Sequence, residues 1–422
     1  MRHPTFHGMS LSQVETWLVL AVVFLAPMNF LRLPNVYVTA SDIMALFALA
    51  AMTFRQRMPL KFFGEATSFW IASLILLQTG LLIGSLVNGD PRDGLIGFAQ
   101  YGFSMFLLPV LICNRPLEET LGLIKAFVLS LVVIMAHGAY VVHYTPDDLR
   151  FMSYSGRLTS LIERENAAGT LAALAIVYAF FLAYVGRLRV VTFGTCIVVL
   201  VYGLMLTASN TGFFLAGIGV IALAVFTGSL RLMGWVLGVG FVALIVTLLF
   251  GEAILPEIFV RRVMATLTTG DITAAGTFTG RMALISEAMG IARDTLFVGL
   301  GIDQYRVVSL HGAPVHNTYL LLLTEGSLMA LLGLMGLFVT GIFLSWRALQ
   351  YPQTRLLGGA SVTVLLMFAL AMNGFAHVYA RFWAVPFILA LALSAAAVSA
   401  RADPQTQPET DHAPPKGAPK NA

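Results

Sequence analysis

Long apolar runs separated by short polar connections dominate this chain of 422 residues. Runs such as "VETWLVLAVVFLAPMNFL" and "RLMGWVLGVGFVALIVTLLF" suit helices that cross a bilayer, because a crossing takes about 20 apolar residues. The pattern predicts an all-α polytopic membrane protein with about twelve transmembrane helices. They are expected near 14–31, 38–54, 67–87, 94–113, 120–143, 166–185, 189–207, 211–227, 232–250, 317–346, 355–373 and 381–400.

The short connections between these runs form two alternating sets that differ in basic residues. One set carries Arg55, Arg57, Lys61, Arg115, Arg187, Arg189, Arg231, Arg347 and Arg355. The opposite set carries only Arg32, Arg92 and Arg381. Short loops rich in lysine and arginine tend to remain in the cytoplasm. We therefore expect the first set, and both termini, to be cytoplasmic.

Two longer connections, about 144–165 and about 251–315, then fall on the periplasmic side. The second is expected to be structured, since "PEIFVRRVMATL" and "TGRMALISEAMGIARD" suit helices and "GLGIDQYR" suits a tight glycine turn. Residues 1–400 are expected to form one membrane-embedded domain. The segment 401–422 is rich in proline and polar residues, which predicts a disordered cytoplasmic tail.

Composition excludes several classes of function. Hydrophobic residues make up 58% and charged residues 11% of the chain, whereas a soluble domain is about 25% charged. The net charge of +4 is modest and spread out, so nucleic acid is not an expected partner. Both cysteines lie in apolar runs, and no residues show metal-ligand spacing, so we expect neither a disulfide framework nor a metal or other cofactor.

Arginines gather in the two periplasmic connections, at Arg150, Arg157, Arg164, Arg261, Arg262, Arg281, Arg293 and Arg306. Any one of them, taken alone, is readily explained as solvated loop charge or as a contact with lipid headgroups. As a set they suit phosphate, which arginine binds through a planar and permanently charged fork. On this side of the membrane the expected ligand is a lipid-linked phosphate or diphosphate.

The stretch "GAPVHNTYLLLLTEG" places polar residues at the mouth of an apolar helix. Pro314 is expected to begin that helix, with His316 and Asn317 in its first turn. The positive field of a helix N-terminus would keep the imidazole neutral and able to accept a proton. His316 is therefore either a helix cap or a base. Glu325, inside the same run, is either a functional acid or a hydrogen-bond partner of a neighbouring helix.

These stretches resemble one family, the bacterial O-antigen ligase and O-antigen or exopolysaccharide polymerase superfamily of membrane glycosyltransferases. The similar segments are "TGRMALISEA", "FVGLGIDQYR" and "HNTYLLLLTEG" near the C-terminus, and "RLTSLIERENAAGTLAAL" earlier. The hydropathy pattern, with one dominant late periplasmic loop, extends the resemblance over most of the chain. The resemblance implies an inner-membrane enzyme that acts on undecaprenyl-diphosphate-linked glycans at the periplasmic face.

The resemblance also implies roles for particular residues. Arg281 and His316 take the positions of the essential arginine and histidine, and Arg157 and Asn166 take the earlier substrate-binding positions. In "LTASNTGFFLAG", Asn210 stands where many members have an arginine, so Arg157 or Arg164 is expected to supply that phosphate contact. The candidate substrate-binding set is Arg157, Arg164, Asn166, Asn210, Arg261, Arg262 and Asn317, beside the catalytic candidates His316 and Arg281.

The expected function is polymerisation of lipid-linked oligosaccharide repeat units. Arginines would stabilise the diphosphate as it leaves, and His316 would orient or deprotonate the acceptor hydroxyl, in a metal-independent and inverting displacement. A ligase that transfers glycan to lipid A–core oligosaccharide is the alternative. A polysaccharide transporter or flippase is the rival from another class. Membrane lipid, the acceptor glycan and other polysaccharide-assembly membrane proteins are the remaining expected partners.

Overall fold

The apolar stretches become helices, so the all-α fold class and a membrane-embedded protein are supported as predicted. The computed structural model describes residues 5–6, 9–33, 38–264 and 278–402. Within these ranges nine helical segments are long and apolar enough to cross a membrane. They are η1 (Gly64–Ala66) with α3 (Thr67–Val87); α4 (Pro91–Gly102) with η2 (Phe103–Leu107) and α5 (Leu108–Ile112); α6 (Leu117–Tyr144); α7 (Glu165–Tyr184); α8 (Val190–Thr207); α9 (Asn210–Thr227); α10 (Leu230–Ile254); α15 (Thr318–Leu349); and α17 (Arg381–Ala402).

Three more apolar helices are shorter: α1 (Leu11–Leu25), α2 (Ala40–Phe54) and α16 (Arg355–Ala371). The predicted count of about twelve crossings depends on them, because a helix of 15 residues is only about 23 Å long. The remaining elements are short or lie in connections: β1 (Thr5–Phe6), β2 (Met9–Ser10), η3 (Ser160–Ile162), α11 (Glu257–Phe259), η4 (Val260–Met264), α13 (Phe278–Asp294) and α14 (Tyr305–Val308).

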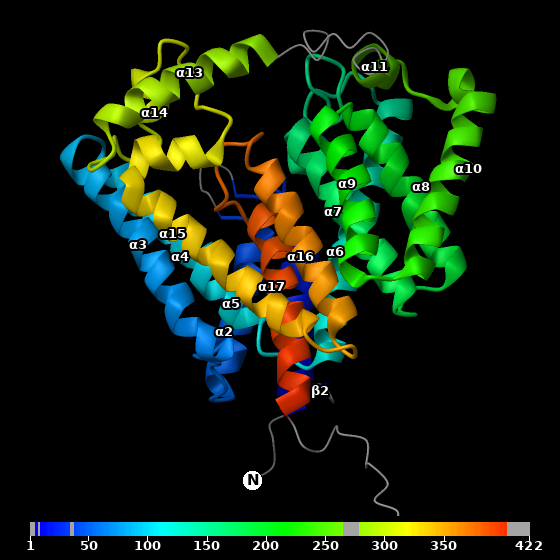
Figure 1. Cartoon of the computed structure of the whole chain (residues 1–422), viewed down its shortest axis with the longest axis horizontal. Coiled ribbons are helices and arrows are strands. Elements are labelled where there is room, and N and C mark those ends of the chain that lie inside the picture. The colour runs from blue at the N-terminus through cyan, green and yellow to red at the C-terminus, as the bar shows by residue number, and fades with distance from the viewer. Residues whose placement is uncertain (1–4, 7–8, 34–37, 265–277, 403–422) are drawn as a thin grey trace, which may run out of the picture.

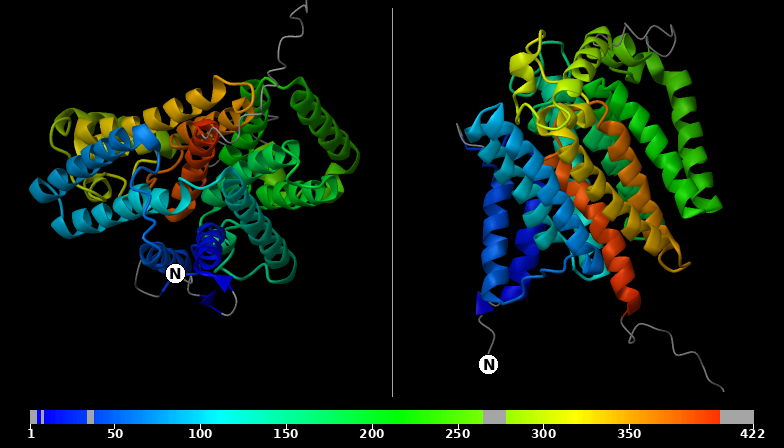
Figure 2. Two further views of the ribbon diagram at one scale, coloured as in Figure 1. Left: turned by 90° about the horizontal axis from the view of Figure 1, so that it is seen from below. Right: turned by 60° about the vertical axis from the view of Figure 1, so that its left-hand side comes forward.

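The connections that bear the candidate residues gather at one end of the helix bundle. Figure 1 shows α11, α13 and α14 at this end, while the strand pair near the N-terminus and the last turns of α17 lie at the opposite end. The second view in Figure 2 shows the same separation. The predicted long connection is thus largely helical. Its residues 265–277 lie outside the described residues, and so does the predicted disordered tail from residue 403 onwards.

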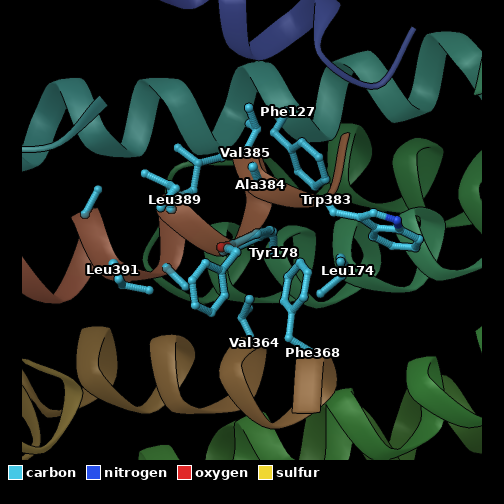
Figure 3. Close-up of a cluster of buried hydrophobic side chains, with 14 of the residues drawn as sticks. Phe127, Leu174, Tyr178, Val364, Phe368, Trp383, Ala384, Val385, Leu389 and Leu391 are labelled. Atoms are coloured by element: carbon cyan, nitrogen blue, oxygen red, sulfur yellow. The ribbon is translucent and has the colours of Figure 1, made fainter. Parts of the chain in front are cut away.

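The main core lies around α7. Every residue from Ala167 to Leu182 is buried, which is the pattern of a helix enclosed on all sides. Figure 3 shows Tyr178 of this helix among side chains of α6, α16 and α17, including Phe127, Phe368 and Trp383. The Tyr178 hydroxyl donates a hydrogen bond of 2.9 Å to the carbonyl of Pro386, which satisfies this polar group within a largely apolar cluster.

Helix α15 is interrupted near the end that carries the candidate residues. Ser327 has φ 65° and ψ −176°, which is not helical, so the backbone hydrogen-bond ladder opens there. The loop after α13 occupies the opening: Leu300 N–H donates to the Thr324 carbonyl at 2.9 Å, and Gly301 N–H donates to the Glu325 carbonyl at 2.8 Å. In return, Leu328 N–H donates to the Leu296 carbonyl at 3.0 Å.

The two glycines of the predicted turn allow this close contact. A Cβ atom on Gly299 would lie 2.1 Å from the carbonyl oxygen of Glu325. Gly301 has φ 96°, and a Cβ atom there would lie 2.7 Å from the Cα atom of Ser85 on α3. The Ser85 hydroxyl also accepts a hydrogen bond of 3.0 Å from the N–H of Ile302. The "GLG" sequence is therefore a turn, as predicted, and it lies wedged between α3 and α15.

We expect Gly299→Ala to destabilise the protein by about 1–3 kcal/mol, because the new methyl group collides with backbone that has no room to move. The measurement is thermal unfolding of purified protein, followed with a thiol-reactive dye that labels the buried Cys113 and Cys196 as they become exposed. Gly290→Ala in α13 is the matched control, since nothing lies within 4 Å of its added carbon. Equal melting temperatures for the two variants would contradict the tight contact.

Candidate functional site

A small second core beneath the loop places the candidate residues. It consists of Leu284, Ala288, Tyr305, Val315 and Leu321, all buried. These residues come from α13, α14, the approach to α15, and α15 itself. Val315 is the chain neighbour of His316, and Leu284 lies one helical turn from Arg281. Packing of this core therefore fixes where both catalytic candidates sit, even though neither belongs to it.

Helix α13 presents Arg281 on the same face as its core residues. Arg281, Leu284, Ala288 and Ala292 follow one another at spacings of three and four, which places them along one side of a helix. Leu284, Ala288 and Ala292 are buried and Arg281 is partly buried. The guanidinium therefore extends the packed face toward His316 and lies within electrostatic range of it.

The helix that follows His316 begins later than predicted. Its first residue is Thr318, and Asn317 is the N-cap: its side-chain oxygen accepts a hydrogen bond of 3.0 Å from the N–H of Leu320. The expectation that Pro314 begins the helix, with His316 in its first turn, is wrong. Asparagine is a strong N-cap residue, the Asn317 backbone is extended, and its carbonyl accepts the first helical bond, 2.9 Å from the N–H of Leu321, so the helical ladder starts there.

Asn317 therefore caps the helix, and His316, the residue before it, does not. Burial, followed by the positive charges of Arg281 and Arg164, lowers the pKa of His316, while the carbonyl of Pro314 opposes the shift. The ring is neutral near pH 7 as a result. Its Nδ1 atom is buried and has no well-formed hydrogen bond to any group that the structure describes. A neutral imidazole with an unsatisfied nitrogen is ready to bind a hydroxyl.

Arg157 is firmly held by neighbouring groups. It is buried, and its Nε donates to the Thr207 carbonyl at 2.8 Å. Its Nη2 donates to Asn166 Oδ1 at 2.8 Å, and its Nη1 lies 3.9 Å from the carboxylate of Glu165. The Ser209 hydroxyl makes a longer contact of 3.5 Å with the same Asn166 oxygen. These bonds tie the connection before α7 to the junction of α8 and α9.

Three arginines from different elements act on one another in this region. Burial lowers the pKa of Arg157 to about 10, with Arg262 and Arg281 adding to the effect and Glu165 opposing it. Burial and then Arg262 lower the pKa of Arg281. Like charges repel more strongly where water is excluded. The arrangement therefore favours an anion with several negative charges among them.

The remaining predicted residues divide between this region and its surroundings. Arg164 is exposed at the start of α7, within electrostatic range of His316. Asn210 is the first residue of α9 and follows Ser209, which contacts Asn166. Arg261 is exposed and lies 3.9 Å from Glu257. Asn317 is engaged by its capping bond and by a bond of 3.1 Å to Asn373.

His377 belongs to the same region but was not among the predicted residues. It lies in the connection between α16 and α17, and burial followed by Arg164, Arg306 and His316 lowers its pKa to about 4. Its ring contacts Tyr379, with centroids 5.1 Å apart. The sequence offers only one signal for it, a histidine beside the end of an apolar run, which is the same signal that His316 gives.

The chain matches no model of a known protein family and no curated protein sequence. Its chemistry is therefore argued from the residues that the structure brings together. Those are Arg157, Asn166, Arg164, Arg262, Arg281, His316 and His377, at one end of an apolar helix bundle.

Titration of the two histidines predicts a loss of stability in acid. An unfolded chain binds a proton at each histidine near pH 6.5, whereas folded His377 binds one only near pH 4. Between these values the unfolded state holds more protons, so stability falls as pH falls from about 6.5 to about 4. The melting temperature of His377→Gln should therefore fall less than that of the wild type between about pH 6.5 and pH 4.

Thermal unfolding of both proteins from pH 8 to pH 4.5 tests this expectation. At pH 8 both rings are neutral in the folded and unfolded states, so any difference there measures packing alone. A difference that grows in favour of the variant as pH falls supports the burial of a neutral His377. Parallel curves at every pH would contradict it.

Proposed function

We propose that this chain is a membrane glycosyltransferase of the O-antigen ligase and polymerase type. It transfers a glycan from undecaprenyl diphosphate to an acceptor sugar hydroxyl at the periplasmic face of a bacterial inner membrane. The observation that carries the proposal is the grouping of Arg157, Arg262 and Arg281, from the two long connections, with a neutral His316 at one end of the bundle. The resemblance of the motifs agrees with it.

The arginines suit the donor. A glycosyl diphosphate already has a good leaving group, and its charge grows on the departing diphosphate as the anomeric carbon–oxygen bond breaks. Fixed guanidinium groups in a partly buried site stabilise that charge without having to reorganise. Mutual repulsion among Arg157, Arg262 and Arg281 is relieved when the diphosphate binds.

His316 suits the acceptor. A sugar hydroxyl is a weak nucleophile until its proton is taken or its lone pair is aimed. In the proposed step the hydroxyl oxygen forms a bond to the anomeric carbon, its proton passes to the imidazole, and the diphosphate leaves with the carrier lipid. This single displacement inverts the anomeric centre. The depressed pKa keeps the ring in the neutral form that the step requires near pH 7.

The arrangement of the ends supports the proposed orientation. The N-terminal strand pair and the last turn of α17 lie at one end of the bundle, and the arginine-bearing elements lie at the other (Figure 1). An even number of crossings with cytoplasmic termini gives this arrangement. The positive short connections then face the cytoplasm, and a lipid-linked donor reaches the site from the outer leaflet while its chain remains in the bilayer.

A polymerase and a ligase make the same donor contacts and differ in the acceptor. We propose a polymerase first, with the "S-x-T" form at Ser209–Thr211 in support. The glycan profile of a deletion strain separates the two. Single repeat units left on the carrier identify a polymerase. Full-length polymer that fails to reach lipid A–core identifies a ligase.

Arg281→Ala should abolish glycan transfer by purified protein in lipid, assayed with a synthetic undecaprenyl-diphosphate glycan. Arg281→Lys should recover only a small part, because an ammonium group cannot reproduce the planar fork that binds two phosphate oxygens. Arg261→Ala is the matched control, since Arg261 faces Glu257 and should retain most activity. Wild-type turnover in Arg281→Ala would remove this residue from the site.

His316→Ala should lose turnover while retaining donor binding, since the arginines hold the diphosphate. His316→Gln keeps some activity if the ring only orients the hydroxyl, and almost none if it must accept the proton. Asn317→Ala should lose about 1 kcal/mol of stability through its cap and remain active. Product formation and retained donor are measured on the same samples. Normal turnover in His316→Ala would move the base elsewhere.

A further inference from the structure

Glu325 is a buried carboxylate that the proposed reaction does not use. It lies on α15, two residues before the interruption at Ser327, and only 2% of its surface is exposed. Burying a carboxyl group is costly unless its oxygens are hydrogen-bonded. The polar partners that Glu325 has in the structure therefore show what this position is for.

Those partners are backbone N–H groups of the loop. Glu325 Oε1 accepts a hydrogen bond of 3.2 Å from the N–H of Tyr305, the first residue of α14. The N–H of Asp303 also bonds to the carboxyl group. Asp303 has φ 62°, a left-handed conformation that is unfavourable for a residue with a side chain. The Glu325 side chain thus holds a strained turn and supplies partners for the free N–H groups at the start of a helix.

From Tyr305 the contacts continue to α13. The Tyr305 side chain is fully buried, and its hydroxyl lies 3.0 Å from both Glu287 Oε2 and the Leu284 carbonyl. Glu287 also accepts hydrogen bonds of 2.7 Å from the Ser309 hydroxyl and from the N–H of Leu310. A continuous set of bonds therefore leads from Glu325 to the helix that bears Arg281 and to the segment that precedes His316.

We propose that Glu325 is a positioning residue that holds α14 in place and, through Tyr305 and Glu287, fixes Arg281 relative to His316. Its catalytic consequence rests on the function proposed above, whereas its effect on the loop does not. The position requires a hydrogen-bond acceptor, since both of its partners are backbone donors. A neutral amide of the same shape can fill it.

The experiment compares three substitutions in protein reconstituted into lipid nanodiscs. Glu325→Gln keeps an oxygen acceptor, and Glu325→Leu removes it. Tyr305→Phe keeps the packing but removes the hydroxyl bonds to α13. Thr340→Val, which removes a buried hydroxyl farther along α15, is the matched control. Backbone hydrogen exchange of residues 300–316 and turnover of the lipid-linked donor are measured for each protein.

Glu325→Leu and Tyr305→Phe should speed exchange across residues 300–316 and lower kcat by roughly 10–100-fold, the loss expected when catalytic groups shift by about 1 Å. Glu325→Gln should exchange like the wild type and keep turnover within about twofold, a rescue that loss of an essential charge would not allow. Thr340→Val should match the wild type.

Two results overturn the proposal. One is wild-type exchange in Glu325→Leu and Tyr305→Phe, and the other is equal damage in Glu325→Gln and Glu325→Leu. A wild-type protein that turns over no lipid-linked glycan refutes the proposed function instead. The exchange measurements still decide whether Glu325 holds the loop, so the two failures are distinguishable.

Discussion

The candidate site depends on one physical constraint. A helix that is interrupted inside an apolar bundle must find hydrogen-bond partners for the backbone groups that the interruption leaves unpaired. Unpaired N–H and C=O groups cost several kcal/mol each where water is absent. At Ser327 the loop after α13 supplies those partners, through bonds between Leu300 and Thr324 and between Leu328 and Leu296. The interruption therefore attaches the loop to the bundle, and every candidate residue carried by the loop is positioned from that attachment outward.

Glycines and small residues make the attachment close enough to work. Gly299 approaches α15 without a side chain between the backbones, and Gly301 does the same against Ser85 of α3. Backbone bonds at this distance form only where no Cβ atom intervenes. The small core around Tyr305 and Val315 packs the same loop against α13 and the start of α15. Rigid support of this kind determines how accurately the candidate residues Arg281 and His316 are placed.

Hydrophobic patterning was sufficient to predict the helices, because a bilayer demands long apolar runs and the chain has them. Helix and turn signals in "TGRMALISEAMGIARD" and "GLGIDQYR" predicted α13 and the glycine turn. The roles of Arg157, Arg281 and His316 came from the family resemblance, and they stay predictions. The start of α15 was misplaced because a proline and an asparagine both suit a helix start, and only the capping bond from Leu320 N–H to the Asn317 side chain decides between them. His377 was missed because its proximity to His316 arises from the packing of α15 against the connection after α16, which no local spacing reveals. The sequence could not show which of the neighbours Arg261 and Arg262 approaches Arg157. In the structure Arg262 acts on Arg157, whereas Arg261 lies beside Glu257.

Arg157, Arg262 and Arg281 repel one another in a partly buried place. Arg157 is held by two neutral groups, Asn166 and the Thr207 carbonyl, and its Nη1 atom lies 3.9 Å from the Glu165 carboxylate, which offsets part of this repulsion. The charged neighbour acting on Arg281 is another arginine, Arg262. Bringing like charges together in a partly buried place lowers stability, and a bound anion relieves that cost. Under the proposed function, the diphosphate of the lipid-linked donor would be that anion. Burial and then Arg281 lower the pKa of His316, so under the proposed function Arg281 would both bind the donor and help to keep the base neutral for the acceptor.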